Sequence, residues 1–313
     1  MPDEKQLARF GFRFERGGTH SSRTMMLDEL TALLDYVNRA DATKADYLNA
    51  IEDYNKINNP LSDAKTLQCL FKLNDYAAFN RKVSKLVSAS SSNIYAAAII
   101  AFVSHQLKQE DPYPFCNNPL DFISITNLSK YKTNVGQFIS EIIGGAQEQP
   151  LIWEPGGKTT EGGFQSEDYI LGDECKFVTL EQILLEGIEA YYQKFKDETC
   201  DFIKLWPTSY SLKGWFVRLI KNGHQRSHIH PAGWLSGVVY LKVVKPSLGN
   251  EGAIEFSLHG YDLPILDKTY PTRIHQPNIG DIVLFPSSLF HRTIPFTTDE
   301  ERCVIAFDLI PGA

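Results

Sequence analysis

Two histidines separated by one residue, His228 and His230, stand in the stretch SHIHPAGWLSGVVYL, just before a run that is typical of a β-strand. Residues i and i+2 of an extended chain face the same side, so we expect the two imidazoles to point the same way. A third histidine, His291, follows the strand-like run DIVLFPSSLF. Three imidazoles that leave further coordination positions open suit a catalytic metal ion. These residues are therefore the predicted metal ligands.

An H-x-H pair alone is a weak signal, so the prediction also depends on Arg302, at the start of CVIAFDLI. Alternation along a strand places Arg302, Val304 and Ala306 on one face. A guanidinium that enters a protein interior is costly unless it meets an anion, and its fork fits a carboxylate. The alternative is a surface arginine that pairs with Glu300 or Glu301.

Two other motifs are set aside. The stretch GGKTT at 156–160 is similar to a phosphate-binding loop, but Ile152 stands where that motif requires its first glycine. Ser287 and Ser288 lie near a histidine, but no nucleophile elbow accompanies them. The sequence thus predicts neither a nucleotide-binding loop nor a serine hydrolase.

The predicted site lies in a part of the chain that is rich in strands. From Gly214 onward, short runs of β-branched and aromatic residues alternate with Gly, Pro and Asn turns. These runs are GWFVRLIK, SGVVYLKVV, AIEFSL, DIVLFP and CVIAFDLI. This pattern predicts a double-sheet jelly roll, in which strands distant in sequence become neighbours.

The first part of the chain has helical periodicity. It is found in LDELTALLDYV at 27–37, in DAKTLQCLFKLNDYAAFNRKVSKLV at 63–87 and in SSSNIYAAAIIAFVSHQLKQ at 90–109. A further helix is expected in NVGQFISEIIGGA. We therefore predict an α+β protein: an all-α accessory domain over 1–115, a helical linker over 116–145 and a jelly-roll domain over 146–313.

Composition sets further limits. The chain has 313 residues, 43% hydrophobic and 22% charged, with a net charge of −7. This is ordinary globular composition without a basic field for nucleic acid or anionic membranes. No apolar run is long enough to span a bilayer, and the N-terminus lacks a signal-peptide core. The five cysteines are scattered, so we expect free thiols and a cytoplasmic location.

Taken together, the H-x-H pair, the distal histidine and the later arginine resemble the 2-oxoglutarate- and Fe(II)-dependent oxygenases. The stretches HIHPAGWLSGVVYL, GDIVLFPSSLFHRTIPF and ERCVIAFDLIP are similar to a bacterial group of these enzymes, whose members often carry helical repeats upstream. The resemblance covers roughly residues 145–313. It implies the double-stranded β-helix of the prolyl-hydroxylase-like superfamily.

The resemblance implies that Fe(II), 2-oxoglutarate and O₂ act together. Fe(II) would be held by His228, His230 and His291, and the co-substrate by Arg302, Tyr240 and Ser236. Related enzymes usually have H-x-D or H-x-E as the first pair, so His230 departs from their pattern. The open alternative is that His230 does not bind the metal directly and that the third position holds water or a carboxylate, such as Glu255 or Asp262.

The activity implied is hydroxylation of an unactivated C–H bond, with a peptide or protein side chain preferred over a free metabolite. Candidate substrate contacts are Trp234, Trp215 and Arg218. Two rival functions stay open: a three-histidine dioxygenase that does not use 2-oxoglutarate, and a non-catalytic metal-binding jelly roll whose helical domain binds a partner.

Overall fold

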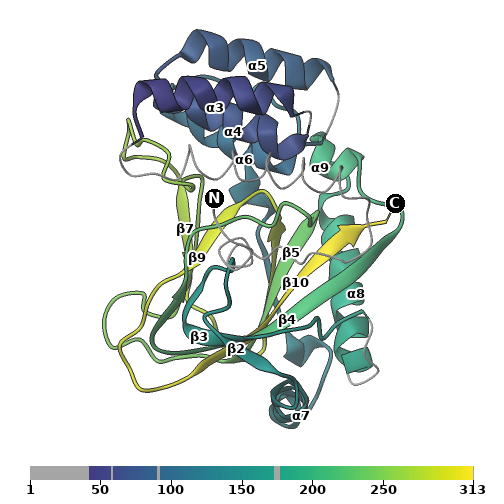
Figure 1. The fold of residues 1–313 in the computed structure, drawn as a ribbon. Helices are drawn as coiled ribbons and strands as arrows, with labels where there is room; N and C mark the ends of the chain where they lie inside the picture. Colours follow the sequence, from purple (N-terminus) through teal and green to yellow (C-terminus); the bar gives the residue numbers. More distant parts are fainter. Residues whose placement is uncertain (1–41, 58, 90–91, 173–176, 313) are drawn as a thin grey trace, which may run out of the picture. The chain divides into compact units, whose positions relative to one another are not determined.

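The computed structural model describes residues 42–57, 59–89, 92–172 and 177–312. Contacts divide the chain into two units (Figure 1). The helical unit comprises Met1–Asn117 with Tyr261–Tyr270, and the β unit comprises Asn118–Gly260 with Pro271–Ala313. The helix expected at 27–37 lies outside the described residues.

The described residues of the helical unit form four helices of equal length: α3 (Lys44–Lys56), α4 (Pro60–Lys72), α5 (Tyr76–Ser88) and α6 (Ile94–Gln106). Each begins after a side chain that accepts a hydrogen bond from a backbone N–H of the first turn. Ala50, Tyr54 and Cys69 form one buried cluster. The helical pattern expected over 63–87 and 90–109 is confirmed as α4, α5 and α6, the last of which ends at Gln106.

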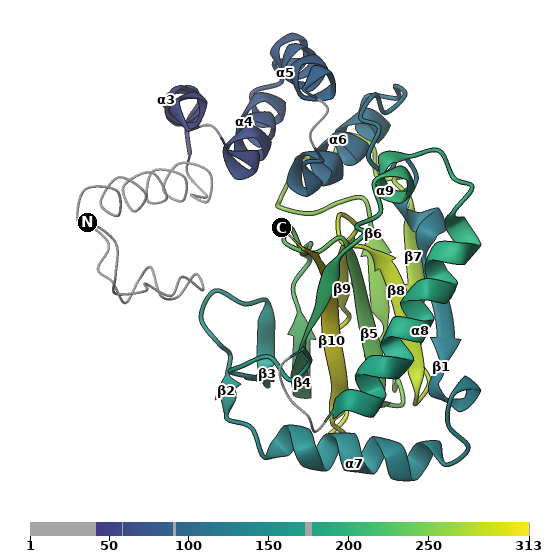
Figure 2. The same cartoon turned by 90° about the vertical axis from the view of Figure 1, so that its right-hand side faces the viewer.

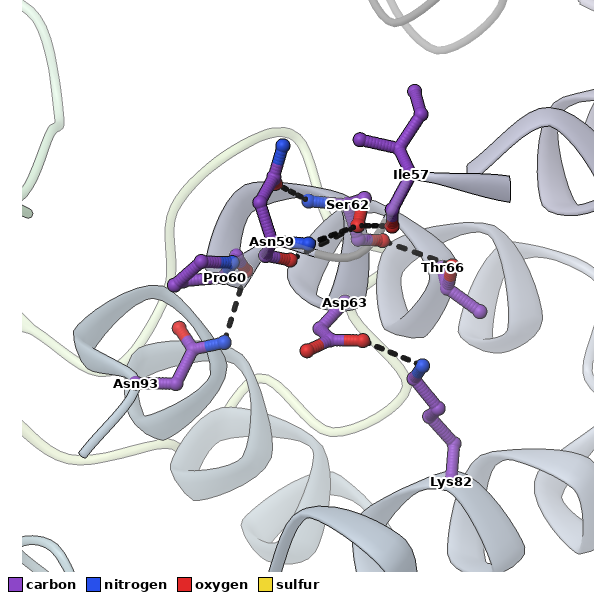
Figure 3. Close-up of polar contacts among 8 residues, drawn as sticks. All are labelled: Ile57, Asn59, Pro60, Ser62, Asp63, Thr66, Lys82 and Asn93. Carbon is purple, nitrogen blue, oxygen red and sulfur yellow. Dashed lines mark hydrogen bonds and ion pairs between the residues drawn. The ribbon is translucent and has the colours of Figure 1, made fainter. Parts of the chain in front are cut away.

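The beginning of α4 is held by side chains from three helices, as Figure 3 shows. Asn59 and Ser62 form a capping box, in which the Asn59 side chain accepts from the Ser62 N–H at 2.8 Å. The Asn93 amide, at the start of α6, donates to the Pro60 carbonyl at 2.9 Å. Lys82 of α5 pairs with Asp63 at 2.6 Å. Polar contacts therefore fix how these three helices meet.

Replacing Asn59 by alanine is expected to lower the free energy of unfolding of the helical unit by about 1 kcal/mol, because the first turn of α4 loses its cap. Urea titration followed by the helical circular-dichroism signal measures this change. The control is Asn80→Ala, at an exposed position inside α5, where alanine is expected to be neutral or slightly stabilising. Equal unfolding energies for the two variants would contradict the capping role.

The described strands of the β unit form two antiparallel sheets. The larger sheet has the strand order β1-β8-β5-β10-β4-β3-β2 and the smaller β7-β6-β9. The strands are β1 (Ser124–Asn127), β2 (Leu151–Trp153), β3 (Thr160–Ser166), β4 (Tyr210–Gln225), β5 (Leu235–Lys242), β6 (Ile254–Ser257), β7 (Thr272–His275), β8 (Asp281–Pro286), β9 (Phe290–Thr293) and β10 (Arg302–Pro311). All five predicted strands are present, and the predicted α+β class with a jelly roll is confirmed.

Helices cover one side of the larger sheet. Figure 2 shows α8 (Val178–Phe195) along the sheet and α7 (Val135–Gln147) at the ends of its strands. The helix expected in NVGQFISEIIGGA is confirmed as α7. The residues expected as a helical linker also contain β1, which pairs with β8 at the edge of the sheet. Its four residues are too short for a recognisable alternation of polar and apolar positions.

The inner faces of the two sheets meet in one apolar core. Alternate residues of β4, β5, β8 and β10 point into it, including Val217, Tyr240, Phe285 and Val304. Within the described residues, no helix combines the length and the apolar character that a bilayer crossing needs.

Candidate metal centre

The backbone brings the three predicted ligands together from two distant segments. His228 and His230 lie in the connection between β4 and β5, and His291 lies in β9. His228 and His291 form an antiparallel bridge, with N–O distances of 3.1 and 3.0 Å. The His230 N–H donates to the Ser287 carbonyl at 3.0 Å. The connection is therefore fixed to β9 at His228 and to the turn between β8 and β9 at His230.

The imidazoles converge on one point. Their candidate ligand atoms all lie within 4.8 Å of one another. Ring centroids are 5.0 Å apart for His228 and His230, 4.3 Å for His228 and His291, and 5.0 Å for His230 and His291. This spacing allows three nitrogens to reach one metal ion.

The other nitrogen of each ring faces an oxygen acceptor. Nδ1 of His228 is 2.6 Å from the Arg226 carbonyl, and Nδ1 of His291 is 3.0 Å from the Leu289 carbonyl. Nδ1 of His230 is 2.6 Å from Oδ1 of Asp308. Because these oxygens can only accept, each Nδ1 carries the proton and each Nε2 keeps a free lone pair. The donor set fits a divalent transition metal.

Burial favours the neutral form of His228 and His291. It lowers the pKa of His228 to about 3, with a smaller contribution from His230. Burial, followed by the neighbouring histidines, holds the pKa of His291 well below its usual range. Neutral imidazoles of this kind bind Fe, Zn, Cu or Ni.

Arg302 is 2% exposed at the start of β10. Its Nε donates to the Gly252 carbonyl at 3.1 Å, while its Nη1 is buried without a hydrogen-bond partner. The alternative pairing with Glu300 or Glu301 is not present: Glu301 pairs with Lys242 at 3.0 Å, and Glu300 accepts from the Lys245 N–H. The guanidinium therefore has no carboxylate partner within the described residues.

Tyr240 lies beside this guanidinium. The Arg302 guanidinium carbon is 5.0 Å from the Tyr240 ring centroid, and the buried Tyr240 hydroxyl also lacks a hydrogen-bond partner. Burial raises the pKa of Tyr240 to about 12, against the opposing effect of the Arg302 charge. A buried cation and a protonated hydroxyl, both with free donors, are suited to the carboxylate of a bound ligand.

The carboxylates considered as alternative ligands do not join the histidines. Glu255 makes a bidentate ion pair with Arg292 at 2.8 and 3.0 Å. In the part of the chain that the structure describes, the ligand group comprises the three histidines and includes neither Glu255 nor Asp262.

Asp308 is the residue that the sequence analysis missed. It lies on β10, 7% exposed, and accepts from Ser236 Oγ at 2.7 Å as well as from His230. Ser236, predicted to bind the co-substrate, also contacts Ser287 Oγ at 2.8 Å. The structure thus places the Ser236 hydroxyl against Asp308, and within the described residues no hydrogen bond joins it to Arg302 or Tyr240. The signal for Asp308 was present, since alternation puts it on the same face as Arg302.

The three candidate substrate contacts lie in different surroundings. The Trp215 ring centroid is 5.5 Å from that of His230. Trp234 is 7% exposed, and its indole donates to the Phe202 carbonyl at 2.9 Å within the core. Arg218 alternates with inward Val217 and packs over the Phe164 ring at 4.5 Å, on the outer face. Trp215 is therefore the one of these three that the structure brings to the histidines.

When the sequence is compared with models of known protein families, one family matches. The model of a family described as "Putative 2OG-Fe(II) oxygenase" matches residues 213–308. No curated protein matches the sequence. Fe(II) and 2-oxoglutarate, the cofactor and co-substrate in the family's description, fit the three unprotonated nitrogens and the unpartnered Arg302 and Tyr240 donors.

Several solved structures are similar at low identity. A prolyl-4-hydroxylase from Pseudomonas putida is 11% identical with a TM-score of 0.43, covering 69% of this chain and 100% of that one. HygX from Streptomyces hygroscopicus, solved with nickel and 2-oxoglutarate, is 15% identical with a TM-score of 0.43, covering 60% and 82%. A Trichoplax adhaerens prolyl hydroxylase is 13% identical with a TM-score of 0.44, covering 62% and 85%.

These likenesses are too low to carry a function, so the family is given by the family model that matches residues 213–308. The resemblance expected from the sequence is confirmed: the segment from residue 213 to residue 308, which holds all three histidines and Arg302, matches the 2-oxoglutarate- and Fe(II)-dependent oxygenases.

Proposed function

We propose that this oxygenase hydroxylates an unactivated C–H bond in a reaction that consumes 2-oxoglutarate and O₂. One oxygen atom enters the succinate that 2-oxoglutarate leaves after loss of CO₂, and the other enters the hydroxyl group of the product. The observation that carries this proposal is the buried pair of Arg302 and Tyr240. Nη1 of Arg302 and the Tyr240 hydroxyl both lack a hydrogen-bond partner, and no carboxylate of the described residues pairs with the guanidinium.

Each residue has a defined part in this proposal. The three histidines hold Fe(II), which supplies activation of O₂ when bound. Arg302 and Tyr240 hold the far carboxylate of 2-oxoglutarate and so orient it toward the metal. Phe285, whose ring centroid is 4.6 Å from that of His291, and Phe256 line the interior beside the ligands and exclude water.

The test begins without oxygen. Wild-type protein is loaded with Fe(II), 2-oxoglutarate is added, and the visible absorption band of the iron–2-oxoglutarate chelate is recorded. Subsequent O₂ is expected to yield succinate. Iron binding without this band would contradict a 2-oxoglutarate-dependent activity and favour a three-histidine dioxygenase or a non-catalytic metal protein.

For the substrate, we propose a peptide or protein side chain. The support is an aromatic surface next to the metal ligands: Trp215 contacts His230, and Tyr169, 52% exposed, packs against Trp215 with centroids 6.4 Å apart. Exposed aromatic rings of this kind are common at protein-recognition surfaces. Incubation with a peptide library and detection of peptides that gain one oxygen atom tests this. Selective oxidation of small metabolites instead would contradict it.

Tyr240→Phe is expected to weaken 2-oxoglutarate binding about 10- to 150-fold, because a hydrogen bond to a charged group contributes roughly 1.5–3 kcal/mol. Calorimetric titration of 2-oxoglutarate into Ni(II)-loaded protein measures the change without turnover. Tyr191→Phe is the matched control, since this hydroxyl is also buried but donates to the Phe122 carbonyl in the packing of α8. An unchanged affinity in Tyr240→Phe would remove Tyr240 from the co-substrate site.

A further inference from the structure

We propose that Asp308 is a positioning residue. Its carboxylate, bound to His230, supplies next to the metal site the negative charge that a carboxylate ligand would otherwise supply directly. The inference rests on the proposed metal site. Three neutral imidazoles leave a divalent ion with its full charge, whereas a ligating carboxylate would reduce it by one. Asp308 provides a negative charge beside His230, so that the imidazole lies between the carboxylate and the ion.

The contacts distinguish His230 from the other two ligands. Nδ1 of His228 and of His291 faces a backbone carbonyl, which is neutral. Nδ1 of His230 faces the Asp308 carboxylate at 2.6 Å. A carboxylate acceptor makes the imidazole a stronger donor to the metal than a carbonyl does, and fixes the ring orientation. The three ligands are therefore chemically unequal although their residue type is the same.

The carboxylate is itself held in place. Ser236 Oγ donates to Asp308 Oδ1 at 2.7 Å and lies 2.8 Å from Ser287 Oγ. The Gly233 backbone also packs closely against these side chains. A Cβ at this position would lie 2.7 Å from Ser287 Oγ and 3.1 Å from Asp308 Cγ. Asp308 is thus held with Oδ1 toward His230.

The experiment compares two buried carboxylates that each contact a histidine. Asp308→Asn keeps the shape and an accepting oxygen but removes the charge. Asp281→Asn is the matched control, since Asp281 is 6% exposed and contacts His275 at 3.0 Å, away from the three ligands. Co(II) affinity is measured by chelator competition, together with the Co(II) visible spectrum and the Fe(III)/Fe(II) potential.

Asp308→Asn is expected to weaken Co(II) binding 10- to 100-fold, the range found for outer partners of ligating histidines. Its Co(II) bands shift and its iron potential rises, because the charge that favours Fe(III) is gone. Asp281→Asn is expected to match wild type in all three measurements. A general packing defect would leave the spectrum and potential of the remaining metal-bound protein unchanged, so these two readouts separate charge from structure.

Three results would overturn the inference. Wild-type affinity, spectrum and potential in Asp308→Asn would show that the charge is irrelevant. A loss as complete as that of His230→Ala would show that Asp308 is itself a ligand. Equal losses in both aspartate variants would show a general effect of buried charge. If wild-type protein bound no metal, the proposed function would fail instead, and this outcome is seen before any variant is made.

Discussion

Arg302→Ala is expected to weaken 2-oxoglutarate binding strongly while leaving metal binding unchanged. The Arg302 guanidinium is buried among the described residues, and its Nη1 has no hydrogen-bond partner. A carboxylate of 2-oxoglutarate would be that partner. Removing one partner of a buried charge pair costs about 2–5 kcal/mol, which corresponds to a loss of affinity of roughly 30- to several thousand-fold. Titration of 2-oxoglutarate into Ni(II)-loaded variant measures it, and Ni(II) affinity is expected to stay unchanged.

The control is Arg218→Ala. Arg218 lies opposite Cys303 on the neighbouring strand and therefore faces the outer side of the same sheet. It also contacts a glutamate, Glu301, at 3.9 Å, which Arg302 does not. Its replacement is expected to leave 2-oxoglutarate affinity at the wild-type value. Loss of metal and co-substrate together in Arg302→Ala would point to a structural role for this arginine and would contradict the proposed site.

Much of this site is predictable from the sequence because it depends on local alternation. The spacing of His228 and His230 predicts two rings on one side, and the period of two in CVIAFDLI predicts Arg302 on the inner face. Neither prediction needs the strand partners to be known. The jelly roll follows from the same short runs and the turns between them.

What the sequence could not supply is the register between strands. Asp308 lies opposite Ser236 because β10 pairs with β5, and this pairing brings the carboxylate to His230. The same limit explains Trp234, whose position next to the histidines in sequence suggested a substrate contact, while packing on Phe202 places its ring in the core. Contacts across strands depend on pairing, which a single sequence does not reveal.

His291→Ala is expected to lower metal affinity by more than about 100-fold, since outer partners of ligating histidines alone contribute 10- to 100-fold. His291 is the proposed ligand from the smaller sheet, whereas His228 and His230 share one connection. The control is His275→Ala, because this histidine also lies in the smaller sheet but pairs with Asp281. Chelator competition with Co(II) measures all three proteins.

The same variant tests whether the metal links the two sheets. An ion bound at 100 times its dissociation constant stabilises the folded state by about 2.7 kcal/mol, and for a unit of this size that corresponds to a rise in Tm of roughly 5–10 °C. Wild type and His275→Ala are expected to show this rise with Co(II), and His291→Ala is not. An equal rise in His291→Ala would mean that the ion binds elsewhere, because without this imidazole the two remaining ligands come from a single connection and no longer join the sheets.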